Sequence, residues 1–129
     1  MLAVVRTATL LLCVLALIGT SASGDVEQAT VPAAKRLLEK GDYRTAVPML
    51  QSLAENEGQA AGEACLLLGS YYKSVAEDVH SAIAAYRKGV RKLGDLRGKV
   101  YFDIQTALVS ALVVANDADG ALEILQSLT

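Results

Sequence analysis

The chain contains very few of the residues that build metal centres, disulfides and aromatic cores. Its 129 residues include one histidine, two cysteines, one phenylalanine and no tryptophan. Metal sites need several histidine, cysteine or carboxylate ligands at short, characteristic spacings, and no group of these residues has such a spacing here. We therefore expect neither a metal ion nor a cofactor.

Sequence signatures of catalysis are missing as well. The chain has neither a glycine-rich phosphate-binding loop nor a Gly-x-Ser-x-Gly nucleophile motif. The single histidine, His80, is expected at the start of a helix with its side chain in solvent. A small lyase or hydrolase using Tyr71, Tyr72 or Asp103 is the alternative, but no motif arranges these side chains. We predict that the protein has no catalytic residues and is not an enzyme.

The beginning of the chain has the order of regions found in a secretory signal peptide. Met1–Arg6 is short and mildly basic, Ala8–Ile18 is largely apolar, and the small residues at 19–24 suit a signal peptidase. We predict a signal-peptide helix over residues 1–23, which would direct the protein to the secretory pathway, the ER lumen, the periplasm or the cell exterior. The alternative is an uncleaved anchor over residues 7–22, although a span needs about 20 apolar residues. Only this alternative would place the protein on a membrane.

Removal of the signal peptide would change both the charge and the cysteine count. Arg6 would be lost, which leaves eleven basic side chains against fourteen acidic ones. Nucleic-acid binding depends on neutralising phosphates, so we expect no nucleic-acid partner. Cys13 would also be lost, and Cys65 alone cannot form an internal disulfide, so the fold must depend on packing. Cys65 falls on an apolar helix face, where we expect a buried, inert thiol rather than a redox or intermolecular role.

The remainder of the chain, residues 24–129, is predicted to be helical almost throughout. β-branched residues are scattered and the alternation of a half-buried strand is absent. Pro32 suits the first turn of a helix, and Pro48 predicts a kink or a late start in the second. The expected helices are separated by Gly41, Gly58, the turn before Ser81, the loop 94–98 and the turn before Asp119. They cover about 32–40, 43–56, 59–73, a fourth segment that Asp78 or Ser81 caps and that reaches Leu93, 99–115 and 119–128.

One sequence pattern occurs three times. Each copy has a turn, an aspartate, an alanine shortly after it and a large apolar residue four positions beyond the alanine. The alanines are 36 and 39 residues apart. A period of this size predicts stacked units, none of which can bury its apolar face alone. The three copies begin at Gly41, Glu77 and Asn116, their alanines are Ala46, Ala82 and Ala121, and their apolar residues are Leu50, Tyr86 and Leu125.

These stretches resemble tetratricopeptide repeats, which are helix pairs of 34 residues. Leu37–Ala46 is very like the turn before the second helix of that repeat, and Leu68–Tyr72 and Ala82–Tyr86 are like the two helices of a second unit. The spacing Ala64-x-x-x-Leu68-Gly69-x-x-Tyr72 is also similar to Sel1-like repeats. The family's tryptophan is absent, and Gly58 and Gly94 replace its closing proline. The resemblance implies an all-α fold of six antiparallel helices, paired as three hairpins in a short right-handed superhelical stack, with repeats at about 27–58, 59–94 and 99–129.

The resemblance also implies where a partner would bind. Repeats of this family bind a peptide or helix on the concave face made by the first helix of each pair. Counting in the repeat frame places charged and hydroxyl side chains of mixed sign on that face, and the alternative for each is ordinary solvated surface. The partner-binding residues expected from the frame are Lys35, Glu39, Glu63, Ser70, Lys73, Asp103, Thr106 and Ser110.

A basic stretch lies in the predicted fourth helix. Arg87 and Arg91, and likewise Lys88 and Lys92, are four residues apart and project together. They form either a patch for an acidic partner or anionic lipid, or a solvated back face near a helix C-terminus, where the helix dipole favours positive charge.

The last predicted helix carries more apolar residues than one face can bury. Leu122 and Ile124 lie too far apart around the helix to share the face that covers its neighbour. We expect one of them to be exposed and to mate with a second copy or another subunit. The function indicated is a non-enzymatic adaptor or scaffold for a protein or peptide partner, and the alternative is a structural subunit of a larger, possibly membrane-associated assembly.

Overall fold

The computed structural model describes residues 30–128, which form six α-helices and no strand. This confirms the all-α prediction, and the helices begin and end within a few residues of the expected positions. The signal peptide and its alternative, the anchor, lie outside the described residues. None of the described helices is long and apolar enough to cross a membrane. The helices are α3 (Val31–Lys40), α4 (Tyr43–Leu53), α5 (Gln59–Ser74), α6 (Val79–Leu93), α7 (Lys99–Val114) and α8 (Ala118–Ser127).

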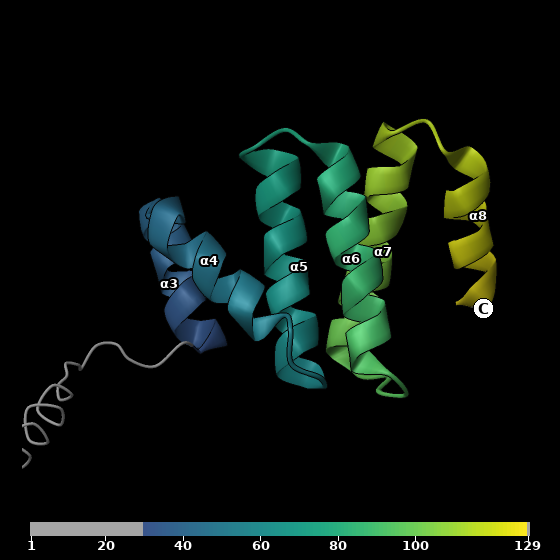
Figure 1. Cartoon of the computed structure of the whole chain (residues 1–129). Helices are drawn as coiled ribbons and strands as arrows, with labels where there is room; N and C mark the ends of the chain where they lie inside the picture. Colours follow the sequence, from purple (N-terminus) through teal and green to yellow (C-terminus); the bar gives the residue numbers. More distant parts are fainter. Residues whose placement is uncertain (1–29, 129) are drawn as a thin grey trace, which may run out of the picture.

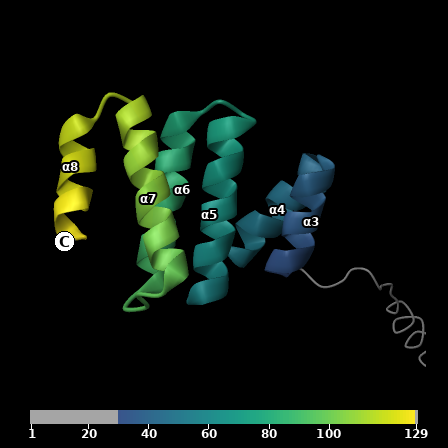
Figure 2. The same ribbon diagram turned by 180° about the vertical axis from the view of Figure 1, so that it is seen from behind.

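Consecutive helices pair as antiparallel hairpins that stand side by side (Figure 1). The pairs are α3 with α4, α5 with α6, and α7 with α8, and α7 also packs against both helices of the middle pair. The view from behind shows α7 in front of α6 (Figure 2). Pro48 lies inside α4, which nevertheless begins at Tyr43.

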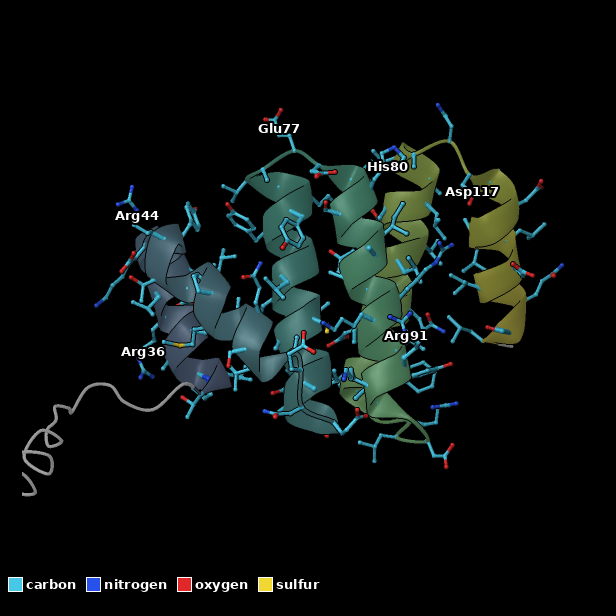
Figure 3. The ribbon with its side chains drawn as sticks, in the orientation of Figure 1. Arg36, Arg44, Glu77, His80, Arg91 and Asp117 are labelled. Atoms are coloured by element: carbon cyan, nitrogen blue, oxygen red, sulfur yellow. The ribbon has the colours of Figure 1, made fainter. Side chains whose placement is uncertain are left out.

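The turn inside each hairpin has the same construction. A residue with positive φ precedes an aspartate, namely Gly41 (83°), Glu77 (56°) and Asn116 (65°). The carboxylate of each aspartate then accepts a hydrogen bond from the backbone N–H three residues later, at 3.3, 3.1 and 2.9 Å for Asp42, Asp78 and Asp117. Such a bond satisfies one of the free N–H groups at the start of a helix. The repeated sequence pattern is therefore a repeated capped turn, and Figure 3 shows Glu77 pointing into solvent from the second one.

The three repeated alanines are all buried. Ala46 and Ala82 are fully buried and Ala121 is nearly so. The apolar residue four positions later is buried in the first two hairpins, as Leu50 and Tyr86. The core consists of two clusters, one joining α3, α4, α5 and α6 and the other joining α6, α7 and α8.

The closest helix crossing joins α5 and α6, where small residues of one helix face larger side chains of the other. A Cβ on Gly62 would lie 2.5 Å from Cδ2 of Leu93, and a Cβ on Gly89 would lie 2.8 Å from Cβ of Cys65. A Cβ on Gly69 would overlap the ring of Tyr86. The two helices can therefore approach so closely only because these three positions are glycines, which have no Cβ.

We predict that Gly69→Ala lowers the free energy of unfolding by about 1–3 kcal/mol, the usual cost of overpacking a filled core. Gly98→Ala is the matched control, because a Cβ at Gly98 meets no atom within 4 Å and its backbone φ of −83° suits any residue. Urea denaturation of both variants measures the difference. Equal unfolding midpoints for the two variants would contradict the close α5–α6 crossing.

Candidate functional site

Two adjoining cavities lie on the face made by the first helix of each hairpin. One, of about 410 Å³, lies between α3, α5 and the start of α7, and the other, of about 540 Å³, lies between α5 and the middle of α7. Leu66, Leu67 and Asp103 line both cavities, so the two adjoin, and together they touch all three hairpins. We call the two cavities together the groove.

Seven of the eight residues expected from the repeat frame line the groove. Lys35 and Glu63 line the first cavity, Asp103 lines both, and four residues line only the second. Glu39 is exposed on α3 and lines neither cavity. The four residues of the second cavity are Ser70, Lys73, Thr106 and Ser110.

Contacts between side chains position several polar groups of the groove. Lys73 Nζ donates a hydrogen bond to Ser110 Oγ at 2.7 Å and so connects α5 to α7. Asp103 forms an ion pair with Lys99 at 2.7 Å, one turn earlier on α7. Thr106 donates its hydroxyl hydrogen to the Phe102 carbonyl at 2.9 Å. The lining of the second cavity therefore includes an ammonium group, hydroxyl groups and a carboxylate.

The floor of the groove was missed by the sequence reasoning. Leu66 and Leu67 are half-buried and line both cavities, whereas Leu68 is buried toward α4 and α6. Successive residues of a helix point about 100° apart, so three consecutive leucines must point to different surroundings, and this was the available signal. Tyr86 also reaches the second cavity, where its hydroxyl bonds to Ser70, and burial raises the pKa of Tyr86 above its ordinary value.

The basic stretch of α6 divides into two pairs with different surroundings. Lys88 forms an ion pair with Glu55 at 2.7 Å, and Lys92 forms one with Glu57 at 3.1 Å. The hydrogen bond and charge of Lys88 hold the pKa of Glu55 below its ordinary value. These lysines thus fasten α6 to the residues that follow α4.

The two arginines of the stretch are exposed on α6. Arg87 lies near Asp117, since both line small cavities between α6 and the last hairpin, and Figure 3 shows Arg91 on the outside of α6. A patch for an acidic partner would consist of Arg87 and Arg91, because Lys88 and Lys92 already have carboxylate partners.

The two candidate edge residues of α8 have different environments. Leu122 is exposed, whereas Ile124 is half-buried and packs against the core cluster of α6, α7 and α8. Ile124 lies three residues after Ala121, on the side of α8 that covers α7, and therefore does not belong to the exposed edge.

The described residues contain no group of three or more histidine, cysteine or acidic side chains that could hold a metal ion. His80 is exposed at the start of α6, as expected. Cys65 is fully buried at the α5–α6 crossing, and burial raises the pKa of its thiol. Comparisons with protein-family models, curated proteins and solved structures gave no significant match.

We predict that Cys65 is protected from alkylation in the native protein, about a hundredfold or more relative to the urea-unfolded chain, because reaction requires local opening. Iodoacetamide labelling followed by mass spectrometry measures the rate of alkylation. The experiment uses the Cys13→Ser variant, so that Cys65 is the only cysteine that can be labelled. Because burial favours the neutral thiol, Cys65 contributes to the stability of the fold at pH values below the ordinary thiol pKa. This contribution declines as the pH rises past the ordinary thiol pKa. Labelling of the folded chain within a fewfold of the unfolded rate would contradict a buried thiol.

Proposed function

We propose that this protein is a non-enzymatic adaptor of tetratricopeptide-like repeats whose groove binds a segment of a partner protein. The observation that carries the proposal is the pair of adjoining cavities that touches all three hairpins and is lined by seven residues that the repeat frame had selected. A depression that crosses several repeat units suits an elongated ligand better than a compact one. Extended binding surfaces of this kind are typical of repeat proteins.

The chemistry of the groove favours a peptide that presents both apolar and polar groups. Its floor is apolar, with Leu66 and Leu67 at the junction of the two cavities, and can take an apolar side chain of the partner. Its rim holds Lys73, Ser110 and Asp103 in place through the contacts described above. Such groups can donate to and accept from a peptide backbone. We expect specificity from the apolar anchor and orientation from the polar rim.

We further propose that the adaptor acts in the secretory pathway or an extracytoplasmic space. The proposal depends on the n-, h- and c-region order of residues 1–23. The amino-terminal residue of the protein recovered from its native cell tests it, because an uncleaved Met1 would favour the anchor instead.

A structural subunit of a larger assembly is the second candidate function. It is favoured by the large apolar side chains exposed on the last hairpin, among them Val113 and Leu122. In this case the groove would have little affinity for free peptides.

A peptide library screened against the protein tests the groove directly. We expect Lys73→Glu to weaken the best binders by about tenfold, since a charge-assisted hydrogen bond contributes roughly 1.5–3 kcal/mol. Arg91→Glu makes the same change of charge on α6 and should leave binding intact. Helicity measured by circular dichroism controls for misfolding. Loss of binding in Arg91→Glu alone would move the site to the basic face of α6, and the absence of any groove-dependent binder would favour the structural subunit.

A further inference from the structure

The second cavity of the groove contains a positive charge that the protein itself does not neutralise. Lys73 Nζ donates a hydrogen bond to Ser110 Oγ at 2.7 Å, and this oxygen is uncharged. By contrast, Lys88, Lys92 and Lys99 each form an ion pair with a carboxylate. In the part of the chain that the structure describes, no carboxylate forms an ion pair with Lys73. A half-buried ammonium group that lines a cavity without a counter-ion can bind an anion.

The carboxylate that lines the same cavity already has a partner. Asp103 forms its ion pair with Lys99 at 2.7 Å, and Lys99 lines the first cavity. Apart from Lys73 and Asp103, the described residues that line the second cavity are apolar or carry a hydroxyl group. The cavity therefore has an excess of one positive charge.

The groups around the ammonium can complete a site for an anion. Because Ser110 Oγ accepts from Lys73, the hydrogen of the Ser110 hydroxyl is free to be donated to a ligand. Lys73 has further N–H groups to donate. Thr106 differs from Ser110, because its hydrogen is donated to the Phe102 carbonyl. Lys73 and Ser110 can thus offer donors to the two oxygens of one carboxylate.

A carboxylate matches this cavity better than a phosphate group. The phosphate of a modified serine, threonine or tyrosine carries a charge of about −1.5 to −2 at neutral pH. The second cavity offers one ammonium group without a counter-ion, and no arginine is among the described residues that line it. The charge of a single ionised aspartate or glutamate side chain balances that ammonium group.

The position of the ammonium group relative to the apolar floor determines the spacing that a ligand needs. Leu66, Ser70 and Lys73 are four and three residues apart and so share one face of α5. Lys73 comes two turns after Leu66, which is about 10 Å along the helix axis. An extended peptide covers this distance in about three residues.

We propose that the second cavity binds the carboxylate of an aspartate or glutamate side chain of the partner segment, with Lys73 and Ser110 as its donors. The acidic residue lies about three positions from an apolar residue that contacts Leu66 and Leu67. This inference rests on the proposed function, because it assigns a ligand chemistry to the same groove.

Blocked peptides of a fixed pattern serve as the probes. Each is acetylated and amidated at its ends and has one leucine, with glutamate, glutamine or lysine three positions before or after it and uncharged residues elsewhere. Retention on the immobilised full chain, measured by mass spectrometry, gives the relative affinities. In one of the two orders, we expect glutamate peptides to bind about tenfold more tightly than glutamine peptides, because a charge-assisted hydrogen bond is stronger than a neutral one.

Substitutions of Lys73 test whether this preference arises in the second cavity. Lys73→Gln should abolish the preference for glutamate over glutamine, and Lys73→Glu should favour lysine peptides instead. Arg44→Glu is the matched control, because Arg44 is exposed on α4 (Figure 3) and lines neither cavity of the groove. It should leave the preference unchanged. Circular dichroism shows whether each variant keeps its helicity. Equal weakening of all peptides by Lys73→Gln, with the preference intact, would show a merely structural role for Lys73 and overturn the proposal.

The remaining outcomes separate this inference from the proposed function. Peptide retention that Leu67→Ala weakens, but that shows no preference for glutamate over glutamine, would overturn the carboxylate site and leave the adaptor intact. A third set of peptides has glutamine at the tested position and a free carboxyl terminus. If this set bound as tightly as the glutamate peptides and depended on Lys73, the ligand would be a chain terminus and the side-chain assignment would be wrong. Absence of any retention that depends on Leu67 would contradict the adaptor itself and this inference with it.

Discussion

The rest of the structure depends on the close crossing of α5 and α6. On α5, Gly62 faces Leu93 of α6, Gly69 faces Tyr86, and Cys65 faces Gly89. At each of these contacts a small residue leaves room for its partner across the crossing. Close packing of this kind leaves little room for adjustment, and the position of one helix follows from that of the other. The pair then presents one surface to α4 and another to α7, and the two core clusters meet on it.

Because the three hairpins share one design, the stack has two distinct faces, and the candidate site lies on one of them. First helices placed side by side make a face that no other described element covers, and the groove lies there. Second helices make the other face, where Lys88 and Lys92 connect neighbouring hairpins through Glu55 and Glu57. The two ends of the stack differ, since charged side chains cover α3 while apolar ones remain exposed on α7 and α8.

Much of the fold could be predicted because its signals are local. An aspartate after a tight turn caps a helix, and the repeated pattern indicated that Ala46, Ala82 and Ala121 are buried. The groove residues followed from the repeat frame, because helical periodicity determines which positions share a face. Contacts between distant segments could not be predicted. The pairing of Lys88 with Glu55 and the exposure of Leu122 rather than Ile124 depend on how the hairpins pack in three dimensions, which no local pattern encodes.

Native-state hydrogen exchange tests the central claim most directly, namely that three unequal hairpins are stabilised by their neighbours through the α5–α6 crossing. Stability in a stack declines toward units with one neighbour. We expect the slowest exchange in α5 and α6 around Cys65, Gly69 and Gly89, and progressively faster exchange toward α3 and α8. Protection of α8 equal to that of α5 and α6, or uniform protection across all six helices, would contradict the account.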